Sequence, residues 1–380
     1  MITANGYLMN LLPASVIAKL KATQKQPCTD QILVGFDGYV DYIQKVVKSA
    51  TSERRIYFDT ITNVSTQIAA ASGKSAQFEL RTLATKMGGN APIMSHALSN
   101  LGIRNYCMGM MGVPEVQAVF RQMNHGSELL SIGQPASTHA LEFEDGKLLL
   151  SEVSSFDEID LDFIIQSRGK HFVLDPLSSS KIVAMVDWSN LPKCTALWTD
   201  ILALVRENSL TGKTFFFDLC DPSKKNNLEI LEVLEVICNF SSVGSVILGL
   251  NENEALKIFQ ALSARRLPDG NSPPGRLRDI SSLIFEQLNI DVLLVHPVDR
   301  TIVVTDQDTF ELYGNVVSNP AILTGGGDNL NAGFCLGLLN GFSLKECMIT
   351  AMGTSGAYVK SGISPSMDDL INYLSLWKTE

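Results

Sequence analysis

The sequence predicts an α/β protein with a mainly parallel central sheet, helices on both faces of the sheet and a small β-rich lid. Three observations lead to this prediction. Short apolar runs alternate along the chain with longer segments of helical periodicity, which is typical of βαβ units. Runs such as VLLVH and FFFDL are apolar without a break, as strands buried on both faces are. Two more polar regions interrupt the alternation and carry strand-like segments of their own.

The strands expected in the main sheet are short, and segments of helical periodicity separate most of them. The strands lie at residues 31–36, 105–110, 171–174, 181–186, 214–219, 245–250 and 291–296. The helices lie at residues 91–101, 114–123, 191–207, 228–239, 252–262, 280–288, 329–339 and 343–360. The start of the chain, MITANGYLMNLLPASVIAKL, favours a further short amphipathic helix.

The two interrupting regions are expected to form the lid. Residues 39–86 contain the strand-like pieces RRIYFDTIT and SAQFELRTL, and residues 138–153 predict a hairpin with Asp145-Gly146 at its turn. The lid would comprise residues 39–86 plus 138–153, and the main domain residues 1–38 plus 87–137 plus 154–380. The alternative is that both regions are surface excursions of one domain. The Pro-, Gly- and Arg-rich segment 264–278 predicts a mobile loop.

Composition excludes several classes of protein. In a chain of 380 residues, 45% hydrophobic and 18% charged residues allow a large core and exclude global disorder. No apolar run reaches the ~18 residues of a membrane helix, and the start lacks the features of a secretory signal. A net charge of −10 argues against nucleic-acid and membrane-surface partners, which need a basic footprint. Seven scattered cysteines, without a CxxC pair, favour reduced core thiols in a cytoplasmic protein.

Several familiar motifs are absent. The GKS and GKT triplets resemble the end of a phosphate-binding P-loop, but Ile68 and Glu207 occupy the positions where its first Gly is required. The sequence has no GxSxG, which argues against an α/β-hydrolase. The five histidines show no metal-ligand spacing, so we expect no zinc site.

The strongest local pattern is LTGGGDNLNAGFCLGLLNG at residues 323–341, where three glycines run into an acid and then an amphipathic helix. Glycines let backbone N–H groups approach an anion closely, and the start of a helix adds partial positive charge. One interpretation is a glycine-rich helix cap in which Asp328 only satisfies backbone donors. The other is an anion hole for a transferring phosphoryl group, with Asp328 as the base that accepts the proton of the attacking hydroxyl.

Two further patterns begin helices. In MGGNAPIMSHALSNLG, Gly88 and Gly89 precede a helix, which predicts either a tight turn or a close approach of backbone to a ligand. In ILGLNENEALKIF, a strand ends at Asn251 and Glu254 lies at the start of a helix. These two residues fit a capping box. They also fit water-mediated binding of Mg²⁺ and phosphate, because Mg²⁺ keeps most of its waters.

The first expected strand, in ILVGFDGYVDYI, delivers Asp37 and Asp41 to its carboxyl end. In doubly wound sheets, ligands bind at that edge. The two carboxylates either bind the hydroxyl groups of a sugar or lie in a solvent-exposed loop.

Taken together and in this order, the patterns resemble the ribokinase-like (pfkB) family of carbohydrate kinases. That family has a Gly-Gly signature before a helix that ends in Leu-Gly, as at Leu101-Gly102 here, and an Asn-x-x-Glu motif in mid-chain. Its C-terminal Gly-Ala-Gly-Asp signature corresponds to Gly325-Gly326-Gly327-Asp328. The resemblance extends over residues 31–370, nearly the whole chain.

The resemblance implies a three-layer α/β/α, Rossmann-like domain of the ribokinase fold, with a small β lid that covers the sugar and forms a homodimer contact. It implies transfer of the γ-phosphoryl group of ATP to a sugar hydroxyl, with Mg²⁺. By residue matching, Asp328 would be the catalytic base and Gly325, Gly326 and Gly327 the anion hole; Asp37, Asp41, Gly88, Gly89 and Asn90 would bind the acceptor; Asn251 and Glu254 would organise phosphate and Mg²⁺, with Glu254 holding the metal through water; and Gly353 and Gly356 would neighbour the adenine.

The chain departs from the family pattern in three places. Ile93 stands where the family usually has Asn, while Asn90 follows the glycine pair directly, so the acceptor can be held differently. The segment 322–323 lacks the common Asp-Thr, which argues against activation by a monovalent cation such as potassium. HPVDRT at 296–301 replaces the usual Thr-x-Gly-x-x-Gly and leaves a donor other than ATP open. Within it, His296 either contacts phosphate or, in the simpler interpretation, only ends a strand.

Two alternatives stay open. A nucleoside or other small-alcohol kinase of the same fold would need an aromatic clamp for the base, which Tyr39, Tyr42 and Phe78 can supply. A non-catalytic sugar-binding regulatory protein would account for the departures, although a binder has no need of Asp328 beside its glycines.

Overall fold

A nine-stranded sheet forms the centre of the molecule. The computed structural model describes residues 4–123, 126–264 and 276–377. The strand order is β14-β13-β12-β11-β10-β9-β1-β5-β6. From β6 to β12 neighbouring strands are parallel, and β12, β13 and β14 pair antiparallel at one edge. The strands are β1 Gln31–Gly35, β5 Asn105–Gly109, β6 Ser127–Ser131, β9 Ser180–Met185, β10 Lys213–Asp218, β11 Gly244–Leu250, β12 Val292–Val295, β13 Arg300–Val304 and β14 Thr309–Tyr313.

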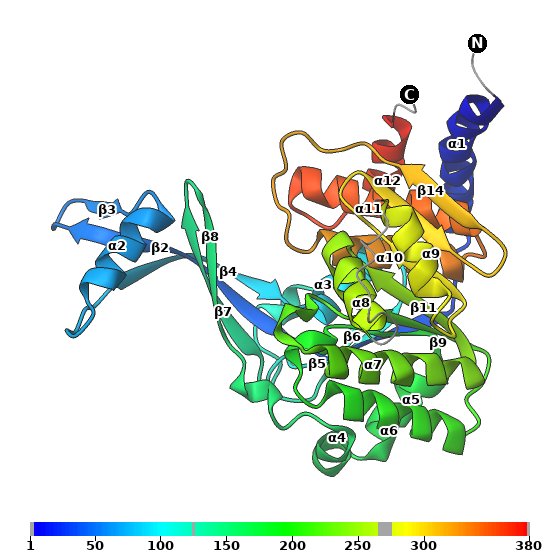
Figure 1. The fold of residues 1–380 in the computed structure, drawn as a ribbon, viewed down its shortest axis with the longest axis horizontal. Helices are drawn as coiled ribbons and strands as arrows, with labels where there is room; N and C mark the ends of the chain where they lie inside the picture. Colours follow the sequence, from blue (N-terminus) through cyan, green and yellow to red (C-terminus); the bar gives the residue numbers. More distant parts are fainter. Residues whose placement is uncertain (1–3, 124–125, 265–275, 378–380) are drawn as a thin grey trace.

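Helices cover both faces of this sheet, as predicted (Figure 1). One face carries α1 Ala4–Lys25, α3 Asn90–Asn100, α10 Gly326–Leu339, α11 Leu344–Ser361 and α12 Met367–Ser375. The other carries α4 Leu161–Arg168, α5 Lys170–Ser179, α6 Cys194–Glu207, α7 Asn227–Asn239, α8 Glu252–Ala264 and α9 Leu277–Phe285. Successive side chains of a strand enter opposite cores: Phe215 and Phe217 pack on one side and Phe216 on the other. The unbroken apolar run FFFDL therefore reflects burial on both faces.

A second sheet projects from the main body (Figure 1). Its strands are β2 Tyr39–Ala50, β3 Arg55–Tyr57, β4 Glu79–Gly88, β7 Ala136–Phe143 and β8 Gly146–Glu152. Their order is β3-β2-β7-β8, with β4 also paired to β2. Helix α2, Ile61–Ala70, packs on this sheet and buries Val64 with Val46, Phe58 and Leu141. We call these strands and α2 the lid; the division of the chain at 38/39, 86/87, 137/138 and 153/154 stays a prediction.

The predicted hairpin is present, with β7 and β8 joined through Glu144 and Asp145. The strand-like piece at 54–62 becomes β3 followed by the start of α2, and the piece at 75–83 becomes the first half of β4. The long strand β2 and helix α2 were not predicted. Strand β2 is hard to recognise because its sequence, YVDYIQKVVKSA, lacks a strict apolar–polar alternation.

One predicted strand is wrong. Residues 171–174 lie within α5, where Val173 and Leu177 are one helical turn apart and both enter the core. A run as short as Phe172-Val173-Leu174 does not by itself distinguish a strand from a buried turn of helix. The spacing to Leu177 was the signal that favoured a helix.

The helix predicted at 114–123 is also wrong, because only a short 3₁₀ turn forms there, at Phe120–Gln122. Phe120 and Met123 pack in a small cluster with Val40 of the lid, and this tertiary packing overrides local helical preference. The prediction further omitted β6, β13, β14, α4 and α12. Most of the loop predicted at 264–278 lies outside the described residues.

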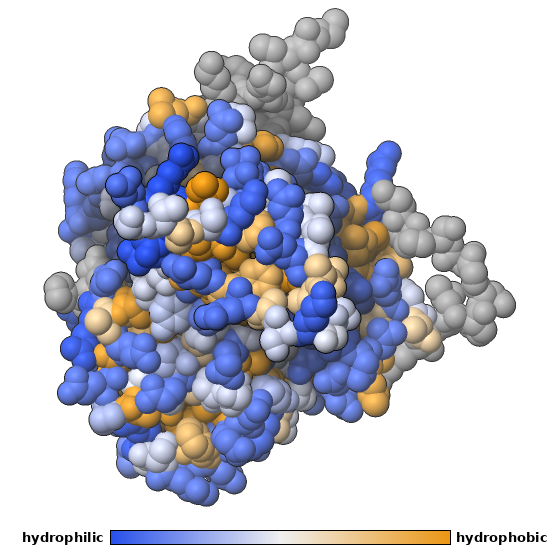
Figure 2. All heavy atoms as spheres, turned by 90° about the vertical axis from the view of Figure 1, so that its left-hand side faces the viewer, coloured by the Kyte–Doolittle hydropathy of each residue, from blue (hydrophilic) through white to orange (hydrophobic). Residues whose placement is uncertain are grey.

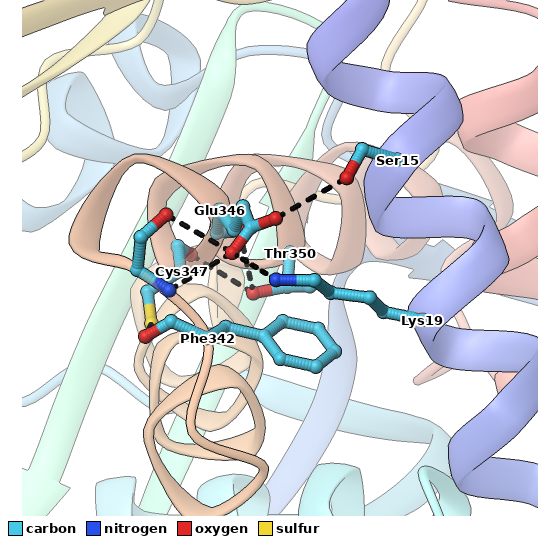
Figure 3. A network of polar contacts seen from close by, with 7 residues as sticks. Ser15, Lys19, Phe342, Glu346, Cys347 and Thr350 are labelled. Carbon is cyan, nitrogen blue, oxygen red and sulfur yellow. Dashed lines mark hydrogen bonds and ion pairs between the residues drawn. The ribbon is translucent and has the colours of Figure 1, made fainter.

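The N-terminal helix α1 is longer than expected and lies beside α11 and α12 (Figure 1). Lys19 of α1 donates to Oε2 of Glu346 at 2.7 Å, and Ser15 donates to Oε1 of the same carboxylate at 3.3 Å (Figure 3). Glu346 also closes the first turn of α11 by accepting from the backbone N–H of Ser343 at 2.9 Å. This contact connects the N-terminal helix to the helices at the C-terminal end.

All seven cysteines are free thiols, and Cys107, Cys194, Cys335 and Cys347 are buried, in agreement with the prediction. Across the described part of the chain, the helices are too short or too polar to cross a membrane.

Candidate active site

The residues singled out by sequence gather at the carboxyl ends of the parallel strands, where the lid joins the main sheet. Strand β1 ends before Asp37, β10 at Asp218, β11 before Asn251 and β12 before His296. Helices α3, α8 and α10 begin at the same edge. Parallel strands bring these distant segments together, as the sequence predicted.

Helix α10 begins with an open turn. Its N-cap is Gly325, with φ +88° in the left-handed region, and no side chain caps the helix at this position. A Cβ at 325 would lie 2.7 Å from Oη of Tyr358, whose hydroxyl donates to the carbonyl of Thr324 at 2.9 Å. Glycine is therefore required here both by backbone conformation and by space. The N–H of Gly326 donates to the carbonyl of Leu323 at 3.2 Å, and the N–H of Gly327 has no acceptor within the helix, which suits it to an anion.

Asp328 lies in the first turn of α10 and is 8% exposed. Burial raises the pKa of its carboxyl well above the usual range, and the charges of Asp218 and Asp37 raise it further. The side chain of Asn90 is in hydrogen-bond contact with it and acts in the opposite direction. The C-terminal signature and the glycine-pair signature are thus joined through one contact, between Asp328 and Asn90.

Asp218, at the end of β10, is a site residue that the sequence analysis missed. It is 6% exposed and accepts from Nδ2 of Asn331 in α10 at 2.6 Å and from the backbone N–H of Cys220 at 2.9 Å. After burial, its charge is the next cause that raises the pKa values of Asp328 and Glu254, and at His296 it opposes the lowering of the pKa by burial. An acid that ends the apolar run FFFDL, at the edge where ligands bind, was the available signal.

Asp37 has a role different from the predicted acceptor contact. It is fully buried, and its two oxygens accept from the backbone N–H groups of Asn90 and Ala91, each at 2.7 Å. Gly89, the N-cap of α3, has φ +100°, and a Cβ there would lie 2.7 Å from the Asp37 carboxylate. Asp37 therefore caps α3 and sets the position of Asn90.

A second buried acid, Asp187, follows β9 and contacts Asp37 by a side-chain hydrogen bond. It also accepts from Nδ2 of Asn190 at 2.6 Å. Burial, and then the charge of Asp37, raise the pKa of Asp187 well above its usual range, so its carboxyl keeps the proton shared by the pair. Burial raises the pKa of Asp37 to about 6.

Asp41 comes from the lid strand β2 and is partly buried. Burial raises the pKa of its carboxyl, and a hydrogen bond with Thr138 of β7 opposes this effect. A Cβ at Gly88 would overlap the Asp41 carboxylate, so the glycine makes room for it. Burial and the charges of Asp328 and then Asp41 raise the pKa of Tyr358 to about 12.

Asn251 and Glu254 form the capping box of α8. The Glu254 carboxylate accepts from the backbone N–H of Asn251 at 2.8 Å and from its Nδ2 at 2.6 Å, while Oδ1 of Asn251 accepts from the backbone N–H of Glu254 at 3.0 Å. Burial raises the pKa of Glu254 well above its usual range, followed by the charges of Asp218 and Asp221. The described residues contain no cluster of three or more ligands able to hold a metal alone. This concentration of negative charge fits a cation that keeps its own waters, such as Mg²⁺.

A cavity of about 370 Å³ adjoins α10. Its polar lining includes Asn251, His296, Gly326 and Gly327, and its apolar lining includes Met352, Tyr373 and Trp377. Gly356 also lines the cavity, and its place beside an adenine stays a prediction. Gly353 instead faces α12, where a Cβ would meet Leu374 and Leu370 at 2.7 and 2.8 Å. The aromatic pair from α12 and the chain after it was missed, because short C-terminal segments give no local signal of a distant pocket.

The doubly wound sheet with its lid, the open glycine turn and the buried carboxyl beside it define a kinase of the ribokinase-like fold. The family model for prokaryotic ketohexokinase matches residues 17–377, and the chain belongs to this family. It is a carbohydrate kinase, a phosphotransferase with an alcohol group of a sugar as acceptor. The resemblance to ribokinase-like carbohydrate kinases and the predicted fold class are confirmed.

The comparisons give one curated relative and several solved structures. The chain is 23% identical over 355 residues to a ketohexokinase of Haloferax volcanii, covering 91% of each chain. It resembles the structure of a carbohydrate kinase from Agrobacterium tumefaciens with a TM-score of 0.63 and 16% identity, covering 92% of this chain and 98% of that one. An adenosine kinase from Sinorhizobium meliloti gives a TM-score of 0.63 and 16% identity over 90% and 97% of the chains. Structural similarity at this level of sequence identity supports the fold. It does not identify the acceptor, which must be argued from the residues of the site.

Proposed function

We propose that the protein transfers the γ-phosphoryl group of ATP to a hydroxyl of a ketohexose. The observation that carries the proposal is the open first turn of α10 with the buried Asp328 beside it, in hydrogen-bond contact with Asn90. An anion hole, a base and groups able to bind hydroxyls then lie within one enclosed site. The family to which the chain belongs supports a ketohexose as acceptor.

In the proposed reaction, Asn90 and Asp41 hold the sugar with one hydroxyl directed at Asp328. Asp328 takes the proton as that oxygen attacks the γ-phosphorus, and the bond from phosphorus to the bridging oxygen of ADP breaks. The backbone N–H of Gly327 and the positive end of α10 stabilise the charge on the phosphoryl oxygens. Because burial raises the pKa of Asp328, the carboxyl accepts this proton more readily than an exposed aspartate would.

Asn251, Glu254 and Asp218 would hold Mg²⁺ through its water molecules. When bound, the ion supplies positive charge to the phosphates of the donor. The capping box fixes the Glu254 side chain at the start of α8, so its position does not depend on the metal. The segment 322–323 offers Ile322 and Leu323 where the family usually has Asp-Thr, and we propose that no monovalent cation is required.

We further propose that the lid mediates a homodimer and that the enzyme acts in the cytoplasm. The lid exposes large apolar side chains: Ile56 is 45% exposed, Ile68 53%, Leu83 52%, Leu149 55% and Leu150 50%. Figure 2 views the molecule from the lid end and shows apolar side chains in patches among hydrophilic ones. A second copy of the lid would cover such side chains, and sedimentation equilibrium would measure the dimer directly.

The three aromatic residues that could clamp the base of a nucleoside are engaged in packing. Tyr39 is buried edge-on against Phe156 at 5.1 Å, and Tyr42 stacks on His139 at 5.4 Å. Phe78 packs on the core of the lid. Because all three rings are used in packing, we favour a sugar as acceptor.

The test is coupled ADP release with MgATP across ketohexoses, aldohexoses, inositols and nucleosides, with the Asp328→Asn protein as the blank. We expect turnover with a ketohexose and a loss of kcat of ~10²-fold or more in the variant, the lower end of a general-base contribution. A variant with near-wild-type kcat would remove Asp328 from the role of base. Turnover with nucleosides alone would assign the fold to nucleoside phosphorylation, and absence of turnover despite ATP binding would favour a sugar-binding regulatory protein.

A further inference from the structure

His296 belongs to the polar lining of the cavity and has no part in the reaction described above. It follows the last residue of β12, and its backbone N–H donates to the carbonyl of Leu250 at 2.9 Å. This bond fixes the residue next to the end of β11, where Asn251 begins the capping box. The ring lies against the first turn of α10, since a Cβ at Gly327 would be 3.5 Å from Cε1 of His296.

The ring nitrogen Nε2 is buried and has no hydrogen-bond partner among the described residues. A buried polar atom without a partner costs about 1–3 kcal/mol, and native proteins rarely leave one unexplained. Here the ring lines the cavity together with Asn251, Gly326 and Gly327. A ligand in the cavity can therefore supply the partner that the protein does not.

The lining of the cavity indicates which part of a nucleotide that partner is. Its apolar lining, with Met352, Tyr373 and Trp377, suits a base, and the open turn of α10 lines the cavity as well. A phosphate chain that runs from the base to this turn comes to lie beside His296, which contacts the same turn. The charged group that acts on the ring is Asp218 of β10, and Asp299 and Arg300 line the same cavity.

We propose that Nε2 of His296 donates a hydrogen bond to the part of the donor's phosphate chain that remains in ADP. The inference rests on the proposed function, because it takes a nucleoside triphosphate as the donor. It assigns a role to the segment HPVDRT, in which the chain departs from the Thr-x-Gly-x-x-Gly of its relatives. A neutral imidazole suits this place, since it donates a hydrogen bond without adding a buried charge.

The test separates the phosphate contact from the rest of nucleotide binding. Adenosine, AMP and ADP are titrated by calorimetry into the wild type, His296→Leu and His296→Gln. The Leu side chain keeps much of the volume and removes the donor, whereas the Gln amide can reach the position of Nε2. Val298→Ala, on the same wall of the cavity but without a polar group, is the matched control.

We expect His296→Leu to lose about 10-fold in ADP affinity or more, the range of a hydrogen bond to a charged group. Its affinity for adenosine should stay within about 2-fold, and His296→Gln should recover most of the loss. An equal loss for adenosine and ADP, or no loss for ADP, would overturn the inference and show that His296 only ends the strand. Failure of the wild type to bind any of the three ligands would instead remove the adenine nucleotide from the proposed function.

Discussion

Helices α3 and α10 begin at the same edge of the main sheet, and their first turns are satisfied in opposite ways. At α3, the carboxylate of Asp37 accepts the N–H groups of Asn90 and Ala91, each at 2.7 Å. At α10, the N-cap is Gly325, which has no side chain to offer. The first helix end is closed by a carboxylate of the chain. At the second, the N–H of Gly326 donates to the carbonyl of Leu323 at 3.2 Å, but no side chain caps the turn, which leaves the N–H of Gly327 to a ligand.

This difference teaches which glycine pattern can hold an anion. Gly88-Gly89 and Gly325-Gly326 look alike in the sequence, since both precede an amphipathic helix. What separates them is Asp37, far from either pair in sequence, which fills the end of α3 with negative charge. A phosphoryl group would be repelled at α3 and attracted at α10, so the structure supports only the latter as the anion hole.

The largest expected effect comes from closing the open turn. Gly325→Ala places a methyl group against the Tyr358 hydroxyl in a backbone region that disfavours side chains, with φ +88°. We expect kcat to fall by ~10²-fold, the order found when one donor of an oxyanion hole is lost, because the turn must shift. The measurement is kcat by coupled ADP release.

Gly341→Ala is the matched control for that variant. Gly341 also has positive φ, +66°, but a Cβ there meets open space among the described residues. It should cost about 1–2 kcal/mol of stability through the backbone alone and leave kcat unchanged. Equal losses of kcat in both variants would mean that Gly325 matters only for folding.

The same contrast explains what the sequence could predict. The open turn was recognisable because its glycines, its acid and its helix are contiguous. Asp37 was placed at the correct edge, yet its capping role depends on Asn90 and Ala91, which only the parallel sheet brings close. Asp187 directly follows the expected strand 181–186, but that position does not show that its carboxyl pairs with Asp37. A short sequence motif does not show which distant residues come close in the fold. It also does not show whether backbone N–H groups bind a carboxylate before a ligand can.

A smaller effect is expected from the buried pair that closes α3. The pKa of Asp37 is raised from 3.8 to about 6, so the folded protein binds this proton more tightly than the unfolded chain. Stability therefore falls as pH rises from about 4 through 6, and the raised pKa of Asp187 extends the loss to higher pH. In the Asp187→Asn variant, the Asn amide can donate a hydrogen bond to Asp37, and it does not titrate in this pH range.

For Asp187→Asn we expect the loss of unfolding free energy between pH 5 and pH 8 to shrink by about 1 kcal/mol or more, since one pKa unit corresponds to about 1.4 kcal/mol. Urea unfolding at several pH values measures this. Asp328 and Glu254 also have raised pKa values, but the wild type and the variant both contain these residues. The difference in pH dependence between the two proteins therefore reports on Asp37 and Asp187. A variant less stable by the same amount at every pH would show that Asp187 acts only through packing.

The smallest effect is expected at a third helix start, α11, which is closed by its own residues. Glu346 accepts from the backbone N–H of Ser343 at 2.9 Å and from its hydroxyl at 3.0 Å, and Lys19 only adds a further donor (Figure 3). The Lys19 side chain is 44% exposed, so Lys19→Met should cost only about 0.5 kcal/mol of unfolding free energy, less at high salt. Glu346→Gln weakens the cap itself and should cost more. If Lys19→Met were the more damaging change, the start of α11 would depend on the N-terminal helix for its capping. The contrast between helix starts capped by their own residues and helix starts left open for a ligand would then fail for α11.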